Sequence, residues 1–330
     1  MAKCDNISKN ISVAFKITLI LLFKVMTKTF QFYILFFLLI SSILPVVAIA
    51  QEKNVESNSK PPADYKPEAS KYRTIFRSTR LVNFQTVETL EKGSFDLRIS
   101  HRLGDFKSGF YNFWGVDGPA SIKIGFDYSL TDNLSIGYAR NSNGKMWEGL
   151  VKWRLLRQRE DGKIPISLTT LATINITSRP PALNEEFSKF ANRMSFVYQL
   201  MIARQFGKVL SLQVAPTFIH YNQVERSSDK NDQFVLASMA RIRLTRSLLL
   251  IGEYGWRLTK MSNSTGVDYR NSAAFGLEIQ TSGHAFQLFV TNSNTMNESQ
   301  FLTSTTSNVL KGEVRLGFNI SRVFKFGRKK

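Results

Sequence analysis

The chain has 330 residues, a formal net charge of +19 and 12% aromatic residues. The positive charge favours anionic partners, but by itself it does not choose among nucleic acid, lipid and small solutes. The single cysteine, Cys4, lies in a segment that we expect to be removed, which excludes disulfides and thiolate metal sites from the mature chain. No later segment has the unbroken apolar run of a membrane-spanning helix, so strands would have to cross any bilayer.

The N-terminal 50 residues have the organisation of a secretory signal peptide. A long apolar run follows several lysines and ends in Ala48-Ile49-Ala50, a small-x-small cleavage pattern. We therefore predict a cleaved signal over residues 1–50, with Met26 as an alternative start that would give a signal of ordinary length. A retained membrane anchor is the alternative, because the run is long enough to span a bilayer. Residues 51–71 are polar and proline-bearing, and we expect a disordered leader there.

Residues 72–92, which include IFRSTRLVNFQTVETLEK, precede the first clear strand. Three alternatives stay open for them: a further strand, a short periplasmic element, or a segment that plugs a barrel. We predict that residues 93–326 form the barrel itself. Residues 327–330 are expected to form a basic tail that is solvated or contacts anionic headgroups.

Alternation of apolar and polar residues is clearest in the stretch ASIKIGFDYSLTDNLSIGYA, from Ala120 to Ala139, with a turn at Thr131–Asn133. This pattern predicts an antiparallel hairpin with one apolar and one polar face. About twelve segments of strand length are predicted: Ser94–Leu103, Ala120–Leu130, Leu134–Ala139, Trp147–Arg157, Ile164–Thr177, Met194–Phe206, Val209–Tyr221, Gln233–Thr245, Leu248–Leu258, Ser272–Thr281, His284–Thr291 and Val309–Phe324.

The connections between these segments alternate in length. Gly207–Lys208 and Arg246–Ser247 are short, whereas Gly104–Pro119 and Asn292–Asn308 are long and polar. Short turns at one rim and long loops at the other are typical of outer-membrane barrels, whose turns are periplasmic and whose loops are extracellular. The sequence therefore predicts an all-β, antiparallel up-and-down transmembrane barrel of about twelve strands, in contact with outer-membrane lipid.

The polar faces of the predicted strands carry many charges, and each would have to be paired or solvated. We therefore expect the apolar faces to contact lipid, with aromatic residues near the strand ends forming interfacial girdles. A soluble sandwich is the alternative, and it would bring Phe126, Ile174 and Leu212 together across a dry core. The candidate lumen charges are Lys123, Asp127, Arg241, Arg243, Glu253, Arg257, Glu278, Glu313 and Arg315.

These charges admit two interpretations. The arginines Arg241, Arg243, Arg257 and Arg315 form a ladder that favours anionic solutes, as charged rings do in pores. Alternatively, they pair with the lumenal glutamates in a closed, ion-paired interior. Twelve strands are compatible with either interpretation.

The stretch SHRLGDFKSGFYNFWGVDGPASIKIGFDYSLTDNLSIGYARNS, followed by GLVKWRLLRQ, resembles a family of functionally uncharacterised bacterial β-barrel proteins, a domain of unknown function. The resemblance runs from about Arg77 to the C-terminus, and its most specific part is His101 to Gln158. It implies an outer-membrane barrel. It brings no known activity, substrate or catalytic residue.

The residues offer little for catalysis or metal binding. His101, His220 and His284 fall on the outward faces of separate predicted strands and lack metal-ligand spacing. A barrel hydrolase with a Ser–His pair on its outer wall would need an outward serine, and none is an obvious partner. Glu185 and Glu186 lie in a predicted long loop without a histidine. We expect no catalytic residue, no metal and no cofactor.

Three functions remain, in order of preference. The first is a passive pore or transport channel for small solutes, anionic ones among them. The second is a closed structural or scaffolding barrel whose extracellular loops bind a partner or ligand. The third and least favoured is an outer-membrane hydrolase. Nucleic-acid binding is not expected, because the signal peptide and the alternation favour a membrane barrel over a basic, aromatic single-strand binder. The substrate, any protein partner and the oligomeric state stay open.

Overall fold

The computed structural model describes residues 72–181, 189–224, 229–259, 267–281 and 283–325. The predicted signal peptide, leader and basic tail lie outside the described residues. Within the described ranges, no helix is both long and apolar enough to cross a membrane.

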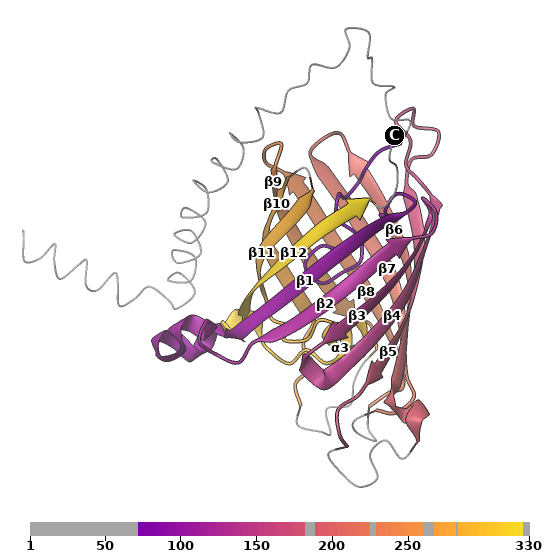
Figure 1. Cartoon of the computed structure of the whole chain (residues 1–330). Helices are drawn as coiled ribbons and strands as arrows, with labels where there is room; N and C mark the ends of the chain where they lie inside the picture. Colours follow the sequence, from indigo (N-terminus) through magenta and orange to yellow (C-terminus); the bar gives the residue numbers. More distant parts are fainter. Residues whose placement is uncertain (1–71, 182–188, 225–228, 260–266, 282, 326–330) are drawn as a thin grey trace, which may run out of the picture. The chain divides into compact units, whose positions relative to one another are not determined.

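Twelve antiparallel strands of the described chain form one closed barrel, each strand pairing with its neighbours in sequence (Figure 1). The first strand also pairs with the last, with Ile99 opposite Ile320, which closes the sheet. The strands are β1 Ser94–Asp105, β2 Ser121–Ser129, β3 Leu134–Asn141, β4 Met146–Leu156, β5 Ser167–Thr177, β6 Met194–Phe206, β7 Leu210–Tyr221, β8 Asp232–Arg243, β9 Leu248–Arg257, β10 Ser272–Gln280, β11 His284–Thr291 and β12 Arg315–Lys325.

Short helices occur in the connections. They are η1 Phe106–Gly115, η2 Asn143–Lys145, η3 Phe190–Arg193, α3 Glu298–Thr303 and η5 Val309–Lys311. All five lie at the same end of the barrel, which we call the long-loop end. The opposite end carries the connections after β2, β4, β6, β8 and β10, and we call it the short-turn end. The predicted alternation of connection length is present except around β4, where residues 157–166 after the strand form a longer connection than residues 142–145 before it.

Side chains alternate between the lumen and the outside along each strand, as the sequence pattern predicts. Phe126 and Leu212, for example, are each 39% exposed and lie on the outer face. They do not meet each other across a dry core, so the sandwich alternative is wrong. The inward positions are mostly polar and buried, as in β5, where Ser167, Thr169 and Asn175 point inward.

The twelfth strand is shorter than predicted, and the prediction of a strand start at Val309 is wrong. Val309–Lys311 forms η5, because the Asn308 side chain accepts a hydrogen bond from the Leu310 N–H and caps this turn. Gly312 then reverses the chain with φ +72°. The strand begins only at Arg315. Glu313 therefore precedes β12 instead of lying on its lumenal face.

Candidate functional site

The barrel interior is filled by two pieces of chain. Residues 72–92, here called the inner segment, enter the lumen before β1, and the side chains from Ser78 to Leu90 are all buried. The helix α3 folds into the lumen at the long-loop end, where Glu298, Phe301 and Leu302 are buried (Figure 1). Irregular backbone in this position needs hydrogen-bond partners from the wall, because no strand ladder supplies them.

Side chains of the wall supply those partners. Arg98 donates to the carbonyl oxygens of Leu81 at 3.1 Å and Arg80 at 2.9 Å, and Lys152 donates to that of Thr79 at 3.0 Å. Polar and charged wall residues are therefore used to satisfy the backbone of the inner segment.

Glu253 also satisfies the backbone of the inner segment, but as a hydrogen-bond acceptor instead of a donor. Its carboxylate accepts hydrogen bonds from the backbone N–H groups of Asn83 at 2.9 Å and Phe84 at 3.1 Å. Two consecutive buried N–H groups of the inner segment thus depend on one acidic side chain from β9. Gln213 of β7 serves two further groups, because it accepts from the Val87 N–H and donates to the Gln85 carbonyl.

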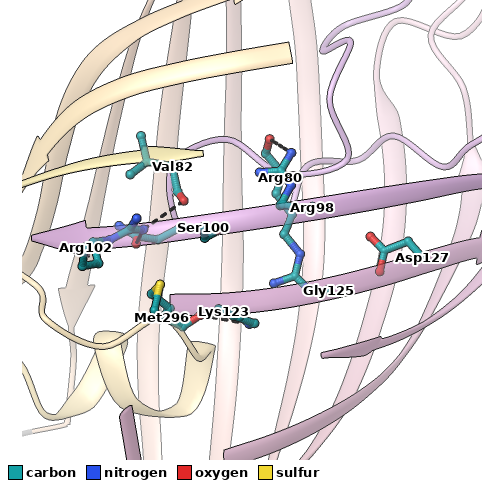
Figure 2. Close-up of a pocket in the computed structure, with 10 residues that line it drawn as sticks. Arg80, Val82, Arg98, Ser100, Arg102, Lys123, Gly125, Asp127 and Met296 are labelled. Atoms are coloured by element: carbon teal, nitrogen blue, oxygen red, sulfur yellow. Dashed lines mark hydrogen bonds between the residues drawn. The ribbon is translucent and has the colours of Figure 1, made fainter. Parts of the chain in front are cut away.

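A buried ion cluster joins the inner segment, the wall and α3. Glu148 of β4 accepts from Arg80 of the inner segment and from Lys123 of β2, both at 2.7 Å. Arg80 also lies 3.6 Å from Glu298 of α3. We call Arg80, Lys123, Glu148 and Glu298 the ion clasp, and Figure 2 shows Arg80 and Lys123 beside Arg98 and Asp127. Asn297 adds a hydrogen bond to the Glu148 carboxylate at 2.8 Å.

The inner segment and α3 also touch through apolar rings. Phe84 stacks on Phe301 with ring centroids 5.2 Å apart. Beside this contact, Tyr221 of β7 donates a hydrogen bond from its hydroxyl to the Ser299 carbonyl, and this fixes α3 to the wall. The two pieces of chain, which enter from opposite ends, therefore meet inside the barrel.

Little free space is left in the described interior around the ion clasp. A cavity of about 20 Å³ lies between Arg80, Arg98, Lys123 and Asp127 (Figure 2), which is room for about one water molecule. A larger cavity of about 670 Å³ lies at the short-turn end, and we call it the vestibule. Its charged lining is Arg77, Glu88, Glu91, Lys92, Asp132, Arg154, Arg157 and Lys325.

The candidate lumen charges occupy three kinds of position. Glu278 is buried and accepts hydrogen bonds from Ser78 and Gln287, while Arg241 is buried with no hydrogen-bond acceptor among the described residues. Glu313 stands apart, because it lies in the loop and pairs with Lys107 at 3.2 Å. Five of the candidate charges face the lumen and are buried: Lys123, Asp127, Arg241, Glu253 and Glu278. Three more are half-buried near strand ends: Arg243, Arg257 and Arg315.

Sequence reasoning missed several charges of the interior. Glu148, Lys152 and Arg154 alternate with outward residues along β4, so the period-two signal was present but broken by neighbouring apolar residues. Arg80 and Glu298 carried no such signal, because they lie in segments without strand periodicity. In the described part of the chain, seven basic and seven acidic side chains are buried: Arg80, Arg98, Arg102, Lys123, Lys152, Arg154 and Arg241, and Glu88, Asp96, Asp127, Glu148, Glu253, Glu278 and Glu298.

His101 and His220 contact aromatic or acidic residues of neighbouring strands, and the His284 ring stacks on Phe286 of its own strand. The His101 ring stacks on Phe318 with centroids 5.1 Å apart, and His220 Nδ1 lies 2.6 Å from the Asp232 carboxylate. None of the described histidine side chains is hydrogen-bonded to a serine. In the same residues, no group of His, Cys, Asp and Glu is arranged to hold a metal ion.

Comparison with solved structures gives a weak likeness of fold. A structure titled "KdgM porin" matches with 8% identity over 70% of this chain and 99% of that chain, at a TM-score of 0.43. The COG4313 outer membrane channel from Pseudomonas putida F1 matches with 14% identity over 72% and 98%, at a TM-score of 0.42. LpxR from Salmonella typhimurium matches with 11% identity over 71% and 100%, at a TM-score of 0.36. No curated protein matches the chain.

The family comparison is more direct. The model of the "Membrane bound beta barrel domain (DUF5777)" matches residues 76–324, which takes in most of the inner segment and nearly all of the barrel. This match confirms the predicted fold class and membrane residence, and it agrees with the resemblance to an uncharacterised barrel family. The chain belongs to this family of membrane-bound β-barrel domains.

Proposed function

We propose that the protein is an outer-membrane channel for small anionic solutes, and that the inner segment and α3 close it in the conformation described here. The short-turn end then faces the periplasm and the long-loop end faces outward. The observation that carries the proposal is the polar nature of the closure. Hydrogen bonds and ion pairs from the wall hold the backbone and Arg80 of the inner segment, and water can replace them. The apolar side chains of the inner segment pack on a cluster of apolar wall residues.

Movement of the inner segment would leave a hydrated passage. The wall residues that hold it, such as Arg98, Lys152 and Gln213, are ionic or amide side chains that bind water as readily as backbone. An apolar interior would not conduct after opening, because a hydrophobic constriction dewets. The polar positions of the lining therefore favour a closed channel over a solid structural core.

The charge of the vestibule supports a preference for anions. Its lining has five basic and three acidic side chains. Two of the acids are paired, Glu88 with Arg154 at 3.1 Å and Glu91 with Lys325. Arg77 and Arg157 have no ion-pair partner among the described residues, so they leave a positive potential at this mouth.

The test is conductance of the purified full chain and of a variant that lacks residues 72–92, both in planar bilayers. We expect rare openings for the full chain and a steady, anion-selective current for the deletion variant. Arg241→Glu in the deletion variant should shift the selectivity toward cations. A folded deletion variant, verified by circular dichroism and by heat-dependent electrophoretic mobility, that carries no current would overturn the channel proposal.

A closed scaffolding barrel is the second candidate, and one observation favours it. The seven buried basic and seven buried acidic side chains balance each other, as a permanently closed interior requires. This candidate predicts that removal of the inner segment unfolds the barrel or leaves it non-conducting. The proposal assigns no catalytic role, because no described histidine is paired with a nucleophile.

A further inference from the structure

The connection between β1 and β2 carries a group of exposed aromatic side chains. We call residues 106–118 the aromatic loop; it consists of η1 and the turn after it. Phe110 is 80%, Tyr111 91% and Phe113 51% exposed, and the Trp114 ring packs edge-on against both phenylalanine rings at 5.7 Å. Figure 1 shows this loop projecting to the side of the barrel instead of folding over its opening.

The base of the aromatic loop is built to hold these rings in one place. Gly104, Gly115 and Gly118 pack backbone against backbone, and a Cβ on Gly115 would lie 2.4 Å from the Gly104 carbonyl oxygen. Phe113 and Trp114 have φ values of +43° and +51°, a left-handed conformation that is costly for bulky residues. Strain of this kind persists only where the surrounding structure fixes the backbone, so the position of the rings is specified.

Polar contacts attach the loop to the strands beside it. The Asp105 carboxylate accepts from the Lys107 N–H at 2.9 Å, and the Lys107 ammonium lies 3.2 Å from Glu313, ahead of β12. The loop therefore has a fixed orientation relative to the wall, and its exposed rings are not a consequence of an unattached chain.

We propose that the aromatic loop lies in the membrane interface beside the barrel, on the side of the long-loop end, with its rings among the lipid headgroups and upper acyl chains. The exposed rings of the loop continue the lipid-facing surface of the barrel. Directly after the loop, Ile122 and Ile124 of β2 point to the lipid and are 36% and 38% exposed. Tyrosine and tryptophan favour this boundary because they have an apolar body and a polar tip. The inference goes beyond the channel function and does not depend on it.

The experiment measures the membrane depth of Trp114. The chain has four tryptophans, so a W147F/W153F/W256F background leaves Trp114 as the single fluorophore. The full chain is placed in phosphatidylcholine vesicles with bromine either near the headgroups or near the chain ends. We expect stronger quenching by the shallow bromine, blue-shifted emission and little quenching by acrylamide. Acrylamide quenching without bromine quenching overturns the proposal, because the loop is then in water.

Two variants test whether the aromatic loop contacts lipid or instead contacts water or protein. Gly115→Ala should displace the rings and remove the preference for shallow bromine, and F110S/Y111S/F113S should expose Trp114 to acrylamide. Phe190→Ser is the matched control, since Phe190 is 65% exposed in η3 at the same end, and it should change nothing. Blue-shifted emission that bromine does not quench would mean that a protein surface covers the loop, and this overturns the inference. Conductance enters none of these measurements.

Discussion

The ring of Phe84 stacks on the ring of Phe301, with centroids 5.2 Å apart and planes inclined by 18°. One ring belongs to the inner segment and the other to α3, so this contact joins the two closures of the lumen. We expect a double-mutant cycle with Phe84→Ala and Phe301→Ala to give a coupling of about 0.5–1.5 kcal/mol in urea unfolding. If the losses in unfolding free energy of the two single variants simply add up in the double variant, the inner segment and α3 are not coupled through this contact.

The ion clasp should be sensitive to the loss of its acid. In Glu148→Gln, Arg80 and Lys123 lose the carboxylate that both contact at 2.7 Å. Breaking a buried pair leaves uncompensated charge, which costs about 3–5 kcal/mol. The control is Lys107→Gln, which breaks a partly exposed pair whose loss should cost about 0–1 kcal/mol. The measurement is the midpoint of urea unfolding of each variant in the same detergent. Equal midpoints would contradict the assigned role of the clasp.

The lumen wall should not accept a methyl group at Gly276. A Cβ there would lie 2.3 Å from the Leu288 carbonyl oxygen and 2.4 Å from the Cβ of Phe289, whose buried ring lies under the Arg102 guanidinium at 4.3 Å. We expect Gly276→Ala to lower the unfolding free energy by about 1–3 kcal/mol. Gly283→Ala is the control, because nothing lies within 4 Å of its Cβ position. A neutral Gly276→Ala would mean that the β10–β11 pairing shifts freely.

The attachment of the aromatic loop should weaken in acid. The Asn308 N–H, and then Lys107, lower the pKa of Glu313 below its ordinary value of 4.5. A depressed pKa stabilises the folded loop above the unfolded value, and this contribution is lost as the pH falls through the folded value. Acrylamide quenching of Trp114 should therefore stay constant from pH 7 to about 5 and rise below about pH 4. Glu313→Gln should remove this transition, and an unchanged transition would assign it to another group.

The strands were predictable because each has one face in lipid and one in a polar interior. Met194–Phe206 and His284–Thr291 agree with β6 and β11 at both ends. The error at Val309 has a physical reason. Leu310 and Val314 continue the apolar alternation across the Asn308 cap and the Gly312 turn, so the local pattern does not show where the strand begins.

The interior was only partly predictable. Alternation shows that Lys123 and Glu253 face inward, but it does not show their partners, because those partners lie in segments without a period. Arg80 and Glu298 meet through tertiary folding, with more than half of the chain between them. Whether the inner segment was a strand, a periplasmic element or a plug was likewise undetermined, since its apolar residues follow no single spacing.

The inner segment is synthesised before every strand, yet some of the residues that fix it belong to the last ones. The Val82 carbonyl accepts a hydrogen bond from Asn319, 237 residues further along the chain, and Ser78 donates one to Glu278, 200 residues away. Contacts of such long range form late in folding. We therefore expect the last strands to complete the attachment of the inner segment as they close the wall. A nascent barrel that lacks β12 has neither a closed wall nor the Asn319 contact to Val82.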